Sequence, residues 1–220
     1  DMIKETLARN TQFLPFPASM RLVRDIMRYA KEQNLRQVFT VSVAPYHLRE
    51  AGASVEQEIA FGVANAIQYM ELGLEAGLSP DEAANQISFF PNIQPRTLEE
   101  IAKFEAFRRL FARVTDAMGV TTARGKQAAI QAYGGGTVTK TTEKGLLHAA
   151  RLANVSLAAA WGAVNGIDSF AYDEVEGITT ERGAQHAIKS REVLAHETGL
   201  RKSVGNPLAG SQVMNYLVDR

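Results

Sequence analysis

Residues 37–43 read QVFTVSV and residues 55–74 read VEQEIAFGVANAIQYMELGL, and these two stretches decide the fold class. The first is short and rich in β-branched residues, which favours a buried strand that Ala44-Pro45 ends. The second predicts a helix that stops at Gly77 and Pro80. Its apolar residues recur at the spacing of one buried helix face: Val55, Ile59, Val63, Ile67, Met70 and Leu74.

The same alternation of strand and helix continues along the chain. Ser19 is expected to cap the first helix and Gly199 to close the last. Short strands between long helices predict βα units and a parallel sheet. The expected strands are 37–43, 86–90, 128–132 and 166–170, and the other expected helices are 19–33, 97–118, 142–160 and 179–198.

Four such units are half of what a closed (β/α)8 barrel requires. We therefore expect an α/β fold in which residues 1–220 form a single domain, about half of a TIM barrel. Half a barrel leaves two sheet edges with unpaired backbone groups, so either a missing half or a partner should cover them. The chain begins with Asp1 rather than methionine, which suggests a fragment or a processed product.

Composition excludes several classes of function. The 24 basic residues equal the 24 acidic ones, so no overall field attracts nucleic acid or an anionic membrane. The chain has no cysteine, which excludes disulfides, thiol catalysis and a thiolate zinc site. No apolar run reaches the roughly 20 residues that span a bilayer. We expect a cytoplasmic protein that binds neither nucleic acid nor membrane.

The string Tyr46-His47-Leu48-Arg49-Glu50-Ala51-Gly52-Ala53 follows the first predicted strand directly. In α/β barrels this position faces the active site. A histidine there can donate a hydrogen bond to a substrate carbonyl and stabilise negative charge on its oxygen. The alternative is a structural histidine that holds the backbone of the loop.

This string resembles the stretch after the fifth barrel strand of cobalamin-dependent acyl-coenzyme A mutases, the methylmalonyl-CoA mutase family, where Ser-Gly-Tyr-His precedes Arg-Glu-Ala-Gly. The likeness continues in order along the chain. It covers Arg9-Asn10-Thr11 with Ser19-Met20-Arg21, Ser88-Phe89-Phe90, Glu99 to Phe104, Gln131 with Gly134, Tyr172-Asp173-Glu174, Glu197-Thr198-Gly199 and Asn206 to Ser211. The chain is thus similar to strands five to eight of the family's barrel and their helices.

The resemblance implies a role for five residues. His47 would hydrogen-bond the thioester carbonyl oxygen, and Tyr46 would shield radical intermediates. Arg9 would bind the free carboxylate of the acyl group through two parallel bonds, unless it is only an exposed cation at a helix end. Ser88 and Gln131 would line the substrate channel.

Several positions depart from the family pattern. Ala44-Pro45 replaces Ser-Gly, and the proline removes a backbone donor beside His47. Gln86 stands where the family commonly has an arginine. Tyr133 follows Gln131-Ala132 in place of the serine of Gln-Thr-Ser-Gly. The pattern Gln-Ser-Leu-His-Thr-Asn has become Asn165 to Phe170, so that Asp168 replaces its histidine.

Other signals are weaker. Gly134-Gly135-Gly136 could cradle a phosphate, but it lacks the P-loop ending, and a flexible loop is the alternative. His148, His186 and His196 lack metal-ligand spacing and are expected to face solvent, so no metal site is predicted. Asp173 with Glu174 could act as acid and base, but turn capping is the simpler interpretation.

Two hypotheses follow. In the first, the chain is part of an adenosylcobalamin-dependent mutase that isomerises a carboxylated acyl-CoA such as methylmalonyl-CoA. It has no Asp-x-His-x-x-Gly motif, so a cobalamin-binding domain or subunit and the other barrel half must come from elsewhere, and the isolated chain should be inactive. In the second, it is a degenerate half-barrel that stabilises a catalytic subunit as a homo- or hetero-oligomer.

Overall fold

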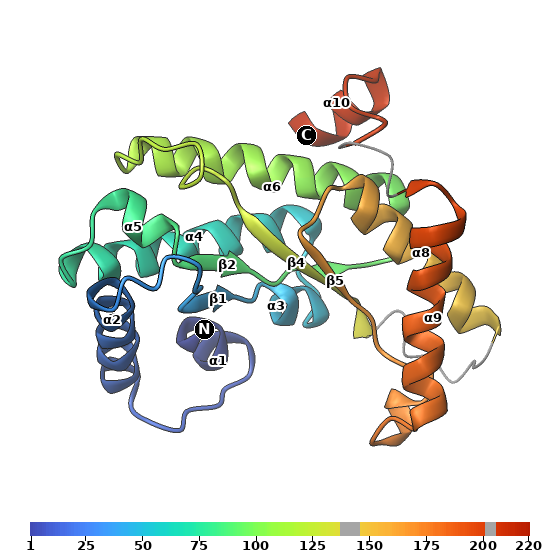
Figure 1. Cartoon of the computed structure of the whole chain (residues 1–220), viewed down its shortest axis with the longest axis horizontal. Helices are drawn as coiled ribbons and strands as arrows, with labels where there is room; N and C mark the ends of the chain where they lie inside the picture. Colours follow the sequence, from blue (N-terminus) through green and yellow to red (C-terminus); the bar gives the residue numbers. More distant parts are fainter. Residues whose placement is uncertain (137–145, 201–205) are drawn as a thin grey trace. The chain divides into compact units, whose positions relative to one another are not determined.

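The computed structural model describes residues 1–136, 146–200 and 206–220 (Figure 1). The chain divides into two compact units, the first formed by residues 1–91 and 107–130 and the second by residues 92–106 and 131–220. Helices alternate with short strands in both, and every strand pairing in the described part is parallel. The predicted α/β class, with parallel βα units that form about half of a barrel, is confirmed. The prediction of a single domain stays a prediction.

The first unit has a parallel sheet of three strands. Val41, Ser42 and Val43 of β1 pair with Ile87, Ser88 and Phe89 of β2, and Ser88 and Phe89 pair with the first two residues of β4. Its elements are α1 (Met2–Ala8), α2 (Phe16–Glu32), β1 (Val41–Val43), α3 (Tyr46–Glu50), α4 (Val55–Glu75), α5 (Pro80–Ala84), β2 (Ile87–Phe89), the end of α6 (Thr97–Ala117) and the start of β4 (Ala129–Gly134).

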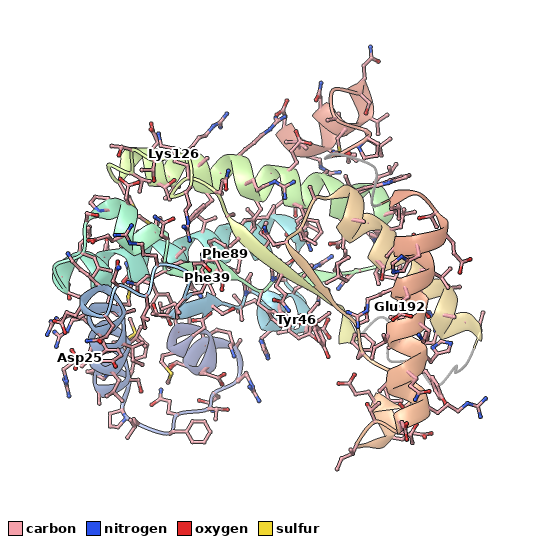
Figure 2. The ribbon with its side chains drawn as sticks, viewed as in Figure 1. Asp25, Phe39, Tyr46, Phe89, Lys126 and Glu192 are labelled. Atoms are coloured by element: carbon pink, nitrogen blue, oxygen red, sulfur yellow. The ribbon has the colours of Figure 1, made fainter. Side chains whose placement is uncertain are left out.

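The core of this unit lies between one face of the sheet and the helices α4 and α6. Phe89 on β2, labelled in Figure 2, is fully buried. Its ring centroid lies 4.7 Å from that of Phe107 and 4.9 Å from that of Phe111, both on α6. Strand side chains alternate between the two faces. Ser42 and Ser88 therefore lie on the opposite face, where Ser42 is exposed and Ser88 half-buried.

The second unit has its own three-stranded arrangement. Asn92 and Ile93 of β3 pair with Tyr133 and Gly134 of β4, and β4 pairs on its other side with β5. A buried ion pair between Lys103 and Glu100 supports β3, because Lys103 Nζ also donates to the carbonyl of Asn92 at 2.5 Å. The remaining elements are β3 (Asn92–Ile93), α8 (Leu146–Trp161), β5 (Gly166–Asp168), the short 3-10 helix η1 (Glu174–Glu176), α9 (Glu181–Glu197) and α10 (Gln212–Asp219).

Most predicted elements are present, with shifted ends. The helices predicted at 97–118 and 179–198 appear as α6 and α9, and Gly77 and Gly199 adopt the left-handed φ of +85° and +76° that ends a helix. The helix predicted at 142–160 appears from Leu146, and its residues 142–145 lie outside the described residues. The strand β3 was not predicted, so the described residues hold five strands rather than four. Within the described ranges, no helix has the length and apolarity needed to cross a membrane.

The predicted cap at Ser19 is wrong. Helix α2 begins at Phe16 after Pro15, with Pro17 in its first turn, where a missing N–H costs nothing. Ser19 is buried inside the helix, and its hydroxyl donates to the carbonyl of Leu14 at 3.4 Å. Two prolines therefore set the start of this helix in place of a side-chain cap.

The expectation that His148 faces solvent is also wrong. His148 on α8 is buried, and its Nε2 lies 3.1 Å from the carbonyl oxygen of Phe170. His186 on α9 is half-buried, with its ring centroid 6.5 Å from that of His148. Only His196 of the three is exposed, so helical position alone did not determine their burial.

Candidate active site

The short helix α3, which carries Tyr46 and His47, begins directly after β1. Pro45 is its N-cap residue, with φ −64° and ψ −12°, so the missing N–H is placed where a helix start needs no donor. The amide of Tyr46 donates to the carbonyl of Phe90 at 3.3 Å, and the two rings lie 5.7 Å apart. The replacement of Ser-Gly by Ala44-Pro45 is thus compatible with an ordered turn into α3.

Arg49 and Asp1 hold α3 and the turn before it in place through four polar contacts. Arg49 on α3 donates from Nη1 to the carbonyl of Ala53 at 2.5 Å, and its Nε lies 3.9 Å from a carboxylate oxygen of Glu58, which is fully buried on α4. Asp1, the N-cap of α1, accepts hydrogen bonds from the amide of Ala44 at 2.8 Å and from the hydroxyl of Tyr69 at 2.9 Å. The loop between β1 and α3 is therefore held to α1 and α4.

His47 is half-buried and lies edge-on to the ring of Tyr46, with 5.1 Å between ring centroids. Its Nδ1 is buried and has no hydrogen-bond partner among the described residues. Burial lowers the pKa of the imidazole, and the positive charges of Lys4 and Arg9 lower it further. The lowered pKa favours the neutral imidazole, which has one nitrogen that can donate and one that can accept.

The cations near His47 come from α1, which the sequence did not predict. The carboxylate of Glu5 lies 2.5 Å from Lys4 Nζ and 3.4 Å from Nη1 of Arg9, so one acidic group serves two basic ones. Lys4 is buried, whereas about half of the Arg9 side chain is exposed. The carboxylates of Glu5 and Glu50 oppose the charges of Lys4 and Arg9 at His47, and the half-exposed guanidinium of Arg9 is a group here that an anionic ligand could reach.

Ser88 and Gln131 occupy strands rather than α3. The hydroxyl of Ser88 on β2 points toward the carbonyl of Val41, at the long distance of 3.5 Å. Gln131 belongs to the second unit, on β4, and its amide nitrogen donates to the carboxylate of Asp168 at 2.6 Å. Of the five predicted site residues, the structure groups Arg9, Tyr46 and His47, with Ser88 in the same unit.

Gln86, which replaces the expected arginine, points into the core of the first unit. Its side-chain oxygen accepts a hydrogen bond from the hydroxyl of Thr40 at 2.8 Å, and its amide nitrogen donates to the carbonyl of Met27 at 3.1 Å. The neutral amide is therefore well matched to this buried position, where an unpaired cation would be costly.

Sequence reasoning missed three contributors: Lys4, Glu5 and Asp168. The first two could have been found from the spacing of Glu5 and Arg9, which are four residues apart, after Asp1 as a helix cap. Asp168 was noticed only as a departure from the family pattern. Its bond to Gln131 depends on the register of β4 and β5, which the sequence does not reveal.

Comparison with known proteins identifies the family. A family model described as methylmalonyl-CoA mutase matches residues 1–220. The chain is 32% identical to the mitochondrial methylmalonyl-CoA mutase of Mus musculus over 220 residues, which are the whole of this chain and 29% of that protein. It is 30% identical to the 2-hydroxyisobutanoyl-CoA mutase large subunit of Aquincola tertiaricarbonis over 218 residues, 99% of this chain and 38% of that subunit.

A third relative is the methylmalonyl-CoA mutase of Rhizobium meliloti (strain 1021), 31% identical over 219 residues and 30% of its length. The chain thus spans about a third of the length of these relatives. The resemblance carried by the Tyr46-His47 string is confirmed, because the match extends over the whole chain and the structure has the expected parallel βα units. The chain belongs to the methylmalonyl-CoA mutase family.

Proposed function

We propose that this chain forms the substrate-binding part of the catalytic barrel of an adenosylcobalamin-dependent mutase acting on a carboxylated acyl-CoA, such as methylmalonyl-CoA. The observation that carries the proposal is His47: a half-buried imidazole whose buried Nδ1 has no hydrogen-bond partner in the described part of the chain, with the cations Lys4 and Arg9 and the carboxylates of Glu5 and Glu50 around it. An acyl-CoA with a free carboxylate has a thioester carbonyl oxygen that His47 could hydrogen-bond and a negative charge that a cation such as Arg9 could bind.

In this proposal each side chain has a distinct task. His47 donates a hydrogen bond to the thioester oxygen and stabilises the charge that accumulates there during rearrangement. Arg9 binds the free carboxylate through its guanidinium. Tyr46, supported by Phe90, closes one side of the substrate and excludes water, and Ser88 and Gln131 line the channel.

The residues of this chain fit binding of the substrate beside such a cofactor, but they include no motif that would hold its cobalt. The strand face opposite the core carries small polar side chains, the exposed Ser42 and the half-buried Ser88. No histidine of the chain stands in an Asp-x-His-x-x-Gly motif, so a further domain or subunit would hold the corrin. When bound, adenosylcobalamin supplies the radical, and the protein supplies position and polarity.

The proposal includes the other parts of the assembly. A sheet face with exposed polar groups in a parallel sheet implies a further layer or barrel half, since parallel sheets are normally covered on both faces. We therefore propose that the isolated chain is inactive and requires that half together with a cobalamin-binding part. A cytoplasmic location stays a prediction, and the named relatives include mitochondrial enzymes.

The test is adenosylcobalamin-dependent turnover of methylmalonyl-CoA and ethylmalonyl-CoA by the native protein with its accompanying segments or subunits. We expect His47→Ala to lower kcat by roughly a hundredfold or more, as for the loss of a general acid or an oxyanion donor. Arg9→Gln should raise KM for carboxylated substrates. His196→Ala and Arg96→Gln are matched controls, because both side chains are exposed in the second unit.

A second candidate is a non-catalytic partner that stabilises a catalytic subunit. It is favoured by the engagement of Arg9 with Glu5 and of Gln131 with Asp168, which reduces the groups left for substrate. A stable native complex that turns over no member of a wide acyl-CoA panel would establish this role against the first.

A further inference from the structure

Gln131 on β4 is hydrogen-bonded through its side chain to the neighbouring strand β5. Its side chain is exposed on β4, and its Nε2 donates to Oδ2 of Asp168 on β5 at 2.6 Å. Gly166 is the direct strand partner of Gln131. A Cβ on Gly166 would lie 3.4 Å from Cδ of Gln131, an ordinary contact distance, so the glutamine side chain lies directly over its strand partner on the way to Asp168.

This bond fixes which end of the Gln131 amide faces outward. A carboxylate has only acceptor oxygens, so the amide nitrogen must face Asp168. The carbonyl oxygen Oε1 therefore points to the other side, where it can only accept a hydrogen bond. The oxygen and nitrogen of a glutamine amide are similar in size, and here the acceptor-only carboxylate of Asp168 determines which of them faces it.

The neighbouring side chains add negative charge. Tyr133 lies two residues after Gln131 on the same side of β4. Burial, followed by the charges of Glu174 and Asp168, raises the pKa of Tyr133 to about 12. The phenol thus stays protonated at neutral pH, and the surroundings of Gln131 repel a carboxylate.

We infer that Asp168 is a specificity-determining residue, which fixes Gln131 with its carbonyl oxygen outward so that this strand pair binds a hydrogen-bond donor such as a hydroxyl and rejects a carboxylate. The inference rests on the proposed function. Asp168 stands where the family pattern has a histidine, so this selectivity distinguishes this chain from that pattern.

The experiment measures equilibrium binding to the native protein by calorimetry, without turnover. Three probes differ only at the acyl group: 3-hydroxybutyryl-CoA with a hydroxyl, methylmalonyl-CoA with a carboxylate, and butyryl-CoA with neither. The variants are Asp168→Asn, which lets Gln131 reverse its amide, and Gln131→Met, which removes the acceptor. Glu192→Gln is the control, because it removes one negative charge from α9 in the same unit, where Glu192 pairs with Lys189 at 2.6 Å (Figure 2).

We expect Asp168→Asn to lower the ratio of hydroxyl to carboxylate affinity by roughly tenfold, the value of one hydrogen bond gained or lost. Gln131→Met should weaken 3-hydroxybutyryl-CoA similarly, and Glu192→Gln should change neither. If both site variants instead weaken all three probes equally, the inference is overturned, because Gln131 and Asp168 then do not distinguish the acyl groups.

Unchanged affinities in Asp168→Asn and Gln131→Met, with normal binding by the wild type, would overturn this inference and leave the proposed function standing. A wild-type protein that binds none of the three probes would overturn both. The two failures are thus distinguishable in one set of titrations.

Discussion

Glu58, fully buried on α4, lies 3.9 Å from Nε of Arg49 on α3, and this ion pair joins the helix that carries His47 to the core of the first unit. The side chain of Arg49 is only 14% exposed, so water solvates neither charge well. Loss of one partner would leave the other charge buried without compensation, and this strongly destabilises the folded state.

Glu58→Ala should therefore destabilise the protein by about 3 kcal/mol, within the range for a broken buried pair. Urea unfolding followed by circular dichroism measures this. Glu75→Ala, at the exposed end of the same helix, should stay close to the wild type. Equal stability of the two variants would show that the pair contributes little.

The pKa of His47 should be below its ordinary value, since burial and the charges of Lys4 and Arg9 oppose protonation. A group with a lowered folded-state pKa contributes stability above its unfolded pKa, near 6.5, and loses it as pH falls toward the folded pKa. Lys4→Met should raise the pKa of His47 toward its ordinary value, measurable by NMR titration of the ring protons. A downward shift in that variant would contradict the electrostatic cause.

Asp81 on α5 should contribute to stability in a pH-dependent way. Its carboxylate accepts four hydrogen bonds from the amides and hydroxyls of Thr121 and Thr122, which hold the pKa of Asp81 well below its usual range. This contribution is present above the unfolded pKa near 3.9 and is lost as pH falls. The Tm difference between the wild type and Asp81→Asn, a few degrees at pH 7, should therefore shrink toward pH 3. Asp25→Asn on α2 is the control (Figure 2).

Gly183→Ala should destabilise the start of α9. A Cβ there would lie 2.2 Å from Oδ1 of Asp173, whose other oxygen accepts hydrogen bonds from the amide and hydroxyl of the helix cap Thr180. We expect a loss of about 1–3 kcal/mol from this overpacking. Gly166→Ala, whose Cβ would meet its neighbours at ordinary contact distance, should cost less in the same thermal melt.

The long helices were predictable from the sequence because each has an apolar face that recurs over several turns. Helix α4 begins at Val55 as expected and ends at Glu75, one residue beyond the last apolar position of its pattern. Helices α3 and α1 have only five and seven residues, too few for the spacing of their apolar residues to reveal a helix. The strand predicted at 37–43 retains only Val41–Val43, because the apolar residues Val38 and Phe39 are exposed before it.

The residues of the candidate site could be predicted only where they belong to a recognisable sequence motif. The Tyr46-His47 string marked α3, and its placement after a strand is what the structure has. Asp173, for which turn capping was the simpler interpretation, accepts hydrogen bonds from the amide and hydroxyl of Thr180, the residue that caps α9. The grouping of Lys4 and Glu5 near His47, by contrast, depends on how α1 packs against α3, and no local pattern encodes that contact.

The parallel pairing of β1 restricts how copies of this chain could associate. β1 has β2 as its strand neighbour among the described residues, and the two run in the same direction. If two copies met at their β1 edges across a two-fold axis perpendicular to the sheet, the two β1 strands would run antiparallel. Such a dimer cannot continue the ladder that β1 and β2 begin, so a symmetric assembly that preserves parallel pairing must bring unlike edges together. A chemical cross-link between two β1 strands would therefore report an antiparallel contact and not a continuation of the parallel sheet.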